Sequence, residues 1–175
     1  SDKPHPNKPV EVETLTSIIG VRGTEFRVAT ADAAFPYDRA EVIQGQVSNI
    51  NTWKHSEIAL SAGHGAVVDP NKAEMQAVAL LPAPQVPKQG MVLRRPRAIW
   101  QFNPVPGAVA YRVIASGDET FNTIAYSAKV TKPETDLGQL PSNGPWYLRA
   151  RAINPQGLEG LDAHSTIELR QPAWI

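Results

Sequence analysis

Short segments in which apolar and polar residues alternate recur along the chain, and they predict β-strands. Val10 and Val12 alternate with Glu11 and Glu13 near the start, and residues 146–152 repeat the pattern near the end. A period of two places one face of a strand against a core and the other in solvent. The 16 prolines in 175 residues are about twice the usual frequency and disfavour long helices, because proline lacks an N–H donor. We therefore expect an all-β protein.

Residues 17–28, SIIGVRGTEFRV, form the most distinctive of these segments. Gly20 and Gly23 bracket a short basic stretch, and residues 25–28 alternate between polar and apolar. This pattern predicts a strand, a sharp corner and a second strand.

Two further segments extend the predicted first sheet. Residues 40–47 read as a strand that contains Gly45. Residues 58–62 and 66–68 read as strands on either side of Gly63-His64-Gly65, which predicts a hairpin or a tight turn.

The amino-acid sequence of these segments resembles that of the FecR domain, a periplasmic module of bacterial envelope signalling proteins. GVRGTEF (20–26) resembles the signature of that family, and VIQGQV (42–47) and IALSAGHGAV (58–67) are similar to its later strands and turn. The resemblance covers about residues 10–70 and implies a short-stranded FecR-like β module. Family members generally have further strands before GVRGTEF, so the N-terminal part of the module is expected to be missing. Its exposed strand edge would then favour self-association.

A proline-rich segment, LLPAPQVP (80–87), interrupts the alternation and favours stiff polyproline geometry. We therefore predict a FecR-like module over residues 1–81, a linker over 82–89 and a second module over 90–175. Residues 1–87 hold 7 basic and 10 acidic side chains, whereas residues 88–175 hold 10 and 7, so the two halves differ in the sign of their charge. A proline-rich loop inside one domain is the alternative.

After the proline-rich segment, apolar and polar residues alternate more regularly. Residues 98–102 and 111–115 each place three apolar side chains on one face, with a Pro106-Gly107 turn between them, and we expect them to be adjacent core strands. About seven short strands in this half predict an antiparallel β-sandwich.

The second half resembles the fibronectin type III domain. WQFNPVPGAVAYRV (100–113) is similar to the family's B and C strands, and WYLRARAINPQG (146–157) to its F strand and the corner after it. The match covers residues 90–171. Trp146 stands where the family usually has the corner tyrosine, so its indole N–H is the expected substitute donor. The resemblance implies an architecture and no particular activity.

Composition excludes several classes of protein. A formal net charge of zero argues against nucleic-acid binding, which generally needs a basic excess. Without cysteine there is no disulfide and no thiol nucleophile. The longest purely apolar run, residues 77–81, is far shorter than a transmembrane segment, and the first residues lack a signal-peptide pattern. We expect a soluble chain, either mature or cut from something larger.

The sequence offers no catalytic, cofactor or metal site. The four histidines, His5, His55, His64 and His164, lack the spacing of a zinc site, and there is no G-x-S-x-G motif. A hydrolase would require His64 to meet a carboxylate and a serine in one cleft, and we expect that it does not.

Two groups of basic residues are candidates for partner binding. Both groups combine positive charge with strand positions that we expect to face outward, and a solvated sheet face is the alternative for each. The first group lies just after the linker, and the second lies on neighbouring predicted strands, where we expect it to extend the first group into one basic surface with an aromatic neighbour. The first group is Arg94, Arg95 and Arg97, and the second is Arg112, Arg149 and Arg151 with Tyr147. Trp53, in a polar stretch, is a further candidate for protein or sugar contact, with packing on the module's rim as the alternative.

These observations predict a non-enzymatic protein of the Gram-negative cell envelope. The FecR resemblance implies a periplasmic sensor, regulatory or scaffolding module that acts through contacts with an envelope protein. The alternative is a peptidoglycan- or carbohydrate-binding, or adhesion-related, structural protein of the cell wall.

Overall fold

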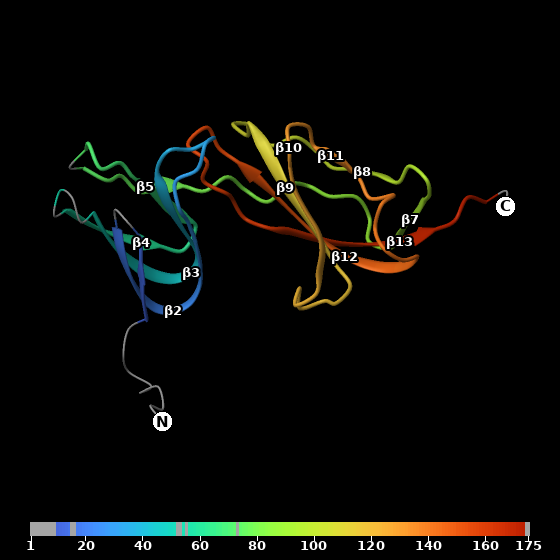
Figure 1. The fold of residues 1–175 in the computed structure, drawn as a ribbon, viewed down its shortest axis with the longest axis horizontal. Coiled ribbons are helices and arrows are strands. Elements are labelled where there is room, and N and C mark those ends of the chain that lie inside the picture. The colour runs from blue at the N-terminus through green and yellow to red at the C-terminus, as the bar shows by residue number, and fades with distance from the viewer. Residues whose placement is uncertain (1–9, 15–16, 52–53, 55, 73, 174–175) are drawn as a thin grey trace, which may run out of the picture. The chain divides into compact units, whose positions relative to one another are not determined.

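The structure is a computed structural model that describes residues 10–14, 17–51, 54, 56–72 and 74–173, with the main chain alone at residues 10, 11, 17–24 and 50. The chain divides into two compact units, Ser1–Leu80 with Gln156–Leu158, and Leu81–Pro155 with Glu159–Ile175. Across the described residues every regular element is a strand, so the expected all-β fold is confirmed (Figure 1). Those residues include no helix of the length and apolarity that crossing a membrane requires.

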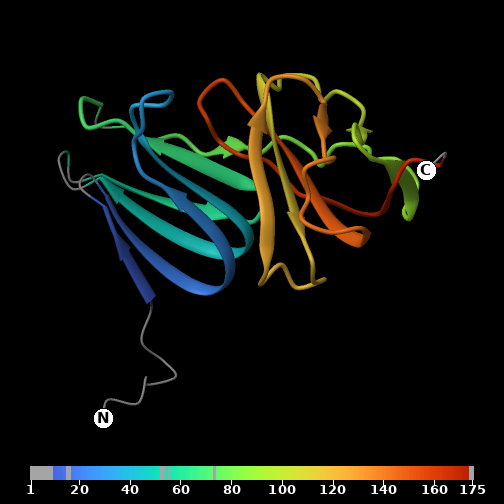
Figure 2. The same cartoon turned by 45° about the vertical axis from the view of Figure 1, so that its right-hand side comes forward.

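The first unit is one antiparallel sheet of six strands. The strands are β1 (Val10–Glu13), β2 (Ser17–Ala29), β3 (Asp38–Asn51), β4 (Ser56–Ser61), β5 (His64–Val68) and β6 (Val78–Ala79). Their order is β1-β2-β3-β5-β6, and β4 also pairs with β3. The two long strands, β2 and β3, curve together through the middle of the unit (Figures 1 and 2).

The expected corner between Gly20 and Gly23 is wrong. β2 runs without interruption from Ser17 to Ala29 and pairs with β3 along its whole length. The ladder instead shifts register between Arg22 and Thr24, opposite Gly45, whose φ is 89°. A bulge of this kind bends a strand but leaves it paired, so the glycines curve the sheet instead of turning the chain.

Of the two possibilities at Gly63-His64-Gly65, a hairpin or a tight turn, the structure has the tight turn. β4 and β5 both pair with β3, β4 along residues 46–51 and β5 along residues 38–42. β4 and β5 therefore lie end to end along β3, with a tight turn at Ala62 and Gly63 between them. At this turn the amide of Gly63 donates to the carbonyl of Val42, 2.8 Å away. His64 is the first residue of β5.

The second unit is a sandwich of seven strands in two sheets, as predicted. The larger sheet has the order β10-β9-β12-β13-β7, and the smaller pairs β11 with β8. The strands are β7 (Met91–Arg94), β8 (Ile99–Gln101), β9 (Ala110–Ser116), β10 (Ile124–Val130), β11 (Glu134–Asp136), β12 (Gly144–Ile153) and β13 (Ala163–Arg170). All pairs are antiparallel except β7 with β13.

The core of the second unit lies between its two sheets. Trp100, on β8, is fully buried and belongs to the same apolar cluster as Val113 and Leu148 of the larger sheet. The alternating burial of β12 and β13 confirms the two-residue period seen in the sequence. Residues 98–102 and 111–115 both face this core, but from different sheets, so they oppose each other instead of lying side by side as expected.

Candidate functional site

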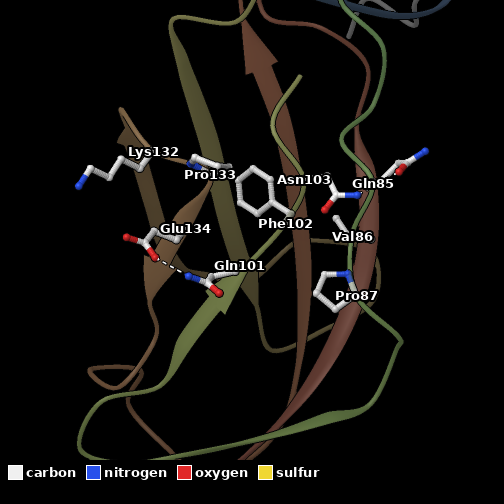
Figure 3. Close-up of a pocket in the computed structure, with 9 residues that line it drawn as sticks. All are labelled: Gln85, Val86, Pro87, Gln101, Phe102, Asn103, Lys132, Pro133 and Glu134. Carbon is white, nitrogen blue, oxygen red and sulfur yellow. Dashed lines mark hydrogen bonds between the residues drawn. The ribbon is translucent and has the colours of Figure 1, made fainter. Parts of the chain in front are cut away.

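A groove of about 720 Å³ lies on the second unit beside the short strand β8 (Figure 3). This volume is within the range of about 300–1,000 Å³ that is usual for ligand sites. The groove is lined by three short segments, Gln85–Pro87, Gln101–Asn103 and Lys132–Glu134, whose nine residues are Gln85, Val86, Pro87, Gln101, Phe102, Asn103, Lys132, Pro133 and Glu134.

Side-chain hydrogen bonds fix both walls of the groove. On one wall the amide of Gln101 donates to the carboxylate of Glu134 at 2.8 Å, across the β8–β11 pair. On the other, the amide of Asn103 donates to Oε1 of Gln85 at 3.0 Å. Figure 3 shows these side chains around the groove, with the ring of Phe102 between Pro133 and Asn103. The lining is therefore polar and held in place before any ligand arrives.

The groove offers no aromatic platform. Phe102 is its one aromatic residue and is only 6% exposed, because its ring packs into the core 5.3 Å from Trp100 and 5.2 Å from Tyr111 between ring centroids. A sugar ring normally needs an accessible aromatic face for stacking. The accessible lining instead combines amide groups, a carboxylate and the ammonium group of Lys132 with the half-buried apolar residues Val86, Pro87 and Pro133.

Main-chain hydrogen bonds tie β8 to the segments on each side. The amide of Phe102 donates to the carbonyl of Pro133 at 3.0 Å, towards β11, whereas the amide of Asn103 donates to the carbonyl of Gln85 at 2.9 Å, on the opposite side. The carbonyl of Ala98 accepts from Leu137 at 2.9 Å, again towards β11. Successive residues of β8 thus direct their main-chain groups to opposite edges.

The arginines after the linker do not form a free basic surface. Arg95 is half-buried and donates to the carbonyls of Gly138 and Leu140 and to Oδ1 of Asn143, the last at 2.8 Å. Arg94 is exposed and donates to the carbonyl of Gln171 at 3.0 Å. Arg97 is exposed. Arg95 is therefore a structural residue.

The other basic candidates lie on the outward face of the larger sheet, away from this cluster. Arg149 pairs with His164 on β13, whereas Arg94 is in register with Arg170. Six residues of strand separate these positions, which amounts to about 20 Å. Arg149 thus lies apart from Arg94 and does not extend the first basic group, contrary to the expectation from the sequence.

Arg149 is held against its own unit. Its guanidinium group lies 3.9 Å from the ring centroid of Phe121, a cation–π contact, and the Nε atom is buried without a hydrogen-bond partner among the described residues. Phe121 has a φ of 58°, which is unusual for a residue other than glycine. Arg149, Tyr147 and Phe121 line a smaller pocket of about 270 Å³.

Arg112 and Arg151 are neutralised by acidic residues. Nε of Arg151 lies 2.6 Å from Oε1 of Glu159 and its Nη1 lies 3.2 Å from Oδ1 of Asp162, while Nε of Arg112 lies 2.9 Å from Oε1 of Glu159. Burial opposes the ionisation of Glu159, but the hydrogen bond from Arg112 and the charge of Arg151 outweigh it and hold the pKa of Glu159 below its ordinary value.

The histidine chemistry considered in the sequence has little support in the geometry. Nδ1 of His64 contacts Oγ of Ser61 at 3.3 Å and the carbonyl of Ala62 at 3.2 Å, and the part of the chain that the structure describes sets no carboxylate against it. Over the same residues, no three His, Asp or Glu side chains gather as metal ligands would. Trp53, His5 and His55 lie outside the described residues.

The groove residues could not be predicted from the sequence. Gln85, Gln101, Asn103 and Glu134 carry no motif, because they are ordinary polar residues that only the sandwich brings together. The proline-rich residues 82–87, part of the predicted linker, are the one signal near the groove that the sequence carries.

Comparisons with known proteins add a likeness to solved structures. No protein-family model matches the chain, and no curated protein matches it. Among solved structures, the chain is similar to a fibronectin type III-like protein from Clostridium thermocellum, with 20% sequence identity and a TM-score of 0.41. The match covers 55% of this chain and 99% of that one.

Proposed function

We propose that this chain is a non-enzymatic recognition protein of the bacterial cell envelope that acts through protein–protein contacts. The groove beside β8 supports this proposal best, because its lining combines amide groups and charged side chains with half-buried apolar residues, a mixture that suits the polar main chain and the side chains of a polypeptide. The first unit would act as a FecR-like sensor, regulatory or scaffolding module, and the periplasmic setting rests on its GVRGTEF segment, residues 20–26.

A carbohydrate ligand, such as a peptidoglycan strand, is the second candidate. The amide groups of Gln85 and Asn103 and the carboxylate of Glu134 are also the groups that bind sugar hydroxyls. The burial of Phe102 weighs against this reading, because no other described residue of the groove provides an aromatic face. We therefore place polypeptide before glycan.

Photo-crosslinking in a bacterial envelope tests the proposal. A photoreactive residue at Lys132, on the groove rim, is expected to give adducts that a protease destroys and a muramidase leaves intact. The same group at Gln139, an exposed position of the same unit outside the groove, is the matched control and should give few adducts. Adducts at Lys132 that muramidase removes and protease leaves on the glycan would favour the carbohydrate reading. Equal crosslinking at both positions would overturn the proposal.

A further inference from the structure

Arg149 differs from the two other arginines on the outward face of the larger sheet, because its guanidinium group has no acidic partner. Arg112 and Arg151 both contact the carboxylate of Glu159. The guanidinium group of Arg149 lies over the ring of Phe121, and no hydrogen bond or ion pair joins it to any residue that the structure describes. A guanidinium group carries five N–H donors and keeps its charge at any pH a protein experiences. Arg149 is therefore a charged group whose donors are free for a ligand.

The loop that carries Phe121 is fixed before any ligand arrives. The carboxylate of Asp118 accepts from the amides of Asn122 and Thr123, at 3.1 and 2.7 Å, and so closes the loop on both of its oxygens. Phe121 has a φ of 58°, a conformation that a bulky residue rarely adopts. The loop thus holds the ring over Arg149 in a strained backbone, an arrangement that is common where a side chain must be positioned for binding.

Strand β13 and the turn before β7 complete the pocket of about 270 Å³ around Arg149. His164 is the register partner of Arg149, and side chains in such a pair lie about 5 Å apart at Cβ. Tyr147 precedes Arg149 by two residues and lines the same pocket. Oγ1 of Thr166 accepts from the amide of Gly90 at 3.0 Å, which holds the turn against β13. Both walls of the pocket are therefore tied to the sheet.

We propose that this pocket binds a carboxylate group of a polypeptide, with the guanidinium group of Arg149 as its donor and Tyr147 and His164 beside it. The ring of Phe121 covers one face of the guanidinium group, and a stacked guanidinium group keeps its edge for two parallel N–H bonds to a carboxylate. The pocket shares no residue with the groove beside β8. The inference rests on the proposed function only for the source of the carboxylate.

Charge, shape and size indicate the occupant. Arg149 is the one permanently charged cation among the described residues of the lining, and Glu119, at the exposed rim, has the opposite charge. A single cation next to an acid does not offset the desolvation of a phosphate dianion, whereas a planar carboxylate needs one guanidinium group. The volume of about 270 Å³ lies below the range of about 300–1,000 Å³ for whole ligands, so the pocket suits a single group of a larger molecule. A polypeptide presents that group at its C-terminus or on an acidic side chain.

Binding of small carboxylates to the whole chain tests the inference, followed by NMR of the Nε–H group of Arg149 and the amides of residues 121 and 149. The probes are N-acetylglycine, which carries a C-terminal carboxylate, and N-acetylglutamic acid α-amide, which carries a side-chain carboxylate. We expect saturable shifts at millimolar probe, and the tighter of the two probes identifies the source of the group. N-acetylglycinamide, which lacks the charge, should cause no shift, and inorganic phosphate should bind more weakly than either carboxylate.

Substitution of Arg149 provides the matching change in the protein. Arg149→Met should abolish the saturable shifts of the amide of residue 121. Arg149→Lys keeps the charge but loses the paired donors, so it should bind about tenfold more weakly than the parent chain. Arg97→Met, at an exposed arginine of the same unit outside the pocket, is the control and should bind like the parent. Thermal unfolding checks that the variants fold, and Arg149→Lys with the uncharged probe keeps the test open if Arg149→Met does not.

Several results would overturn the carboxylate site. They are equal shifts with N-acetylglycine and N-acetylglycinamide, no saturable shift at millimolar probe, tighter binding of phosphate, or binding that survives Arg149→Met. The crosslinks at Lys132 report on the groove alone. Carboxylate binding without those crosslinks would leave this site standing and reject the proposed function, and the reverse result would reject this site only.

Discussion

The indole N–H of Trp146 donates a hydrogen bond to the main-chain carbonyl of Ser142, 3.0 Å away. This bond ties the start of β12 to the loop before it. The substitute donor predicted from the sequence is therefore present, with the bond running four residues back along the chain.

Trp146→Phe should destabilise the second unit more than Trp100→Phe. Both changes remove the same indole volume from the core, but Nε1 of Trp100 has no hydrogen-bond partner among the described residues, whereas that of Trp146 does. The lost hydrogen bond should make the difference about 1 kcal/mol in the free energy of unfolding. Urea denaturation of the two variants measures it, and an equal loss would show that the indole bond contributes nothing.

Glu159→Gln should destabilise the protein at neutral pH and lose its effect in acid. The carboxylate of Glu159 accepts from both Arg112 and Arg151, so its removal should cost about 2 kcal/mol near pH 7. Because the pKa of Glu159 is lowered from 4.5, its stabilising contribution is present above pH 4.5 and is lost as the pH falls through the folded-state pKa.

Unfolding free energies of parent and Glu159→Gln, measured from pH 7 down to the acid limit of folding, should therefore converge below pH 4.5. A gap that stays constant over this range would contradict the assigned ion pairs. Glu168→Gln provides a control, since Oε1 of Glu168 is 3.9 Å from an exposed Arg170 and its removal should change stability by less than about 0.5 kcal/mol.

Arg95→Ala should destabilise the second unit by about 2–3 kcal/mol, because it leaves the carbonyls of Gly138 and Leu140 without their charged donor. Arg97→Ala, two residues away at an exposed position, should change stability by less than about 0.5 kcal/mol. Thermal unfolding of the pair measures the contrast. Equal effects would mean that Arg95 does not anchor this loop.

Gly45→Ala tests the bulge of the first unit. Gly45 has a φ of 89° where β2 and β3 shift register, and a side chain in that conformation costs about 1–2 kcal/mol. Gln46→Ala, at the exposed neighbouring position of β3, should be nearly neutral. If Gly45→Ala also proved neutral in circular-dichroism melting, β3 would not need its left-handed residue there.

Alternation of side chains was enough to predict the longer core strands of the sandwich, but not the short strands β7 and β11. The apolar residues of β12 at the expected phase are buried, because a two-residue period allows only one face to meet the core. The donor role of Trp146 also followed from the sequence, since an indole has no other polar function to offer.

The strand pairing of the first unit could not be predicted from the residues next to its glycines. Glycine permits both a corner and a bulge, and the choice between them at Gly23 was made by the continuous ladder of β2 with β3. The turn at Gly63 likewise joins two strands that pair with β3 and not with each other. Neighbouring sequence does not contain this information, because the hydrogen-bond partner lies elsewhere in the chain.

The sequence by itself determined an all-β chain with buried faces at known positions, because the period of a strand is a local property. Only the tertiary structure decided what the polar residues do. Arg95 and Arg151 look alike in the sequence, yet one binds carbonyl groups and the other carboxylates, because distant segments supply their partners. The groove beside β8 arises in the same way, since three segments that lie apart in the sequence supply its lining.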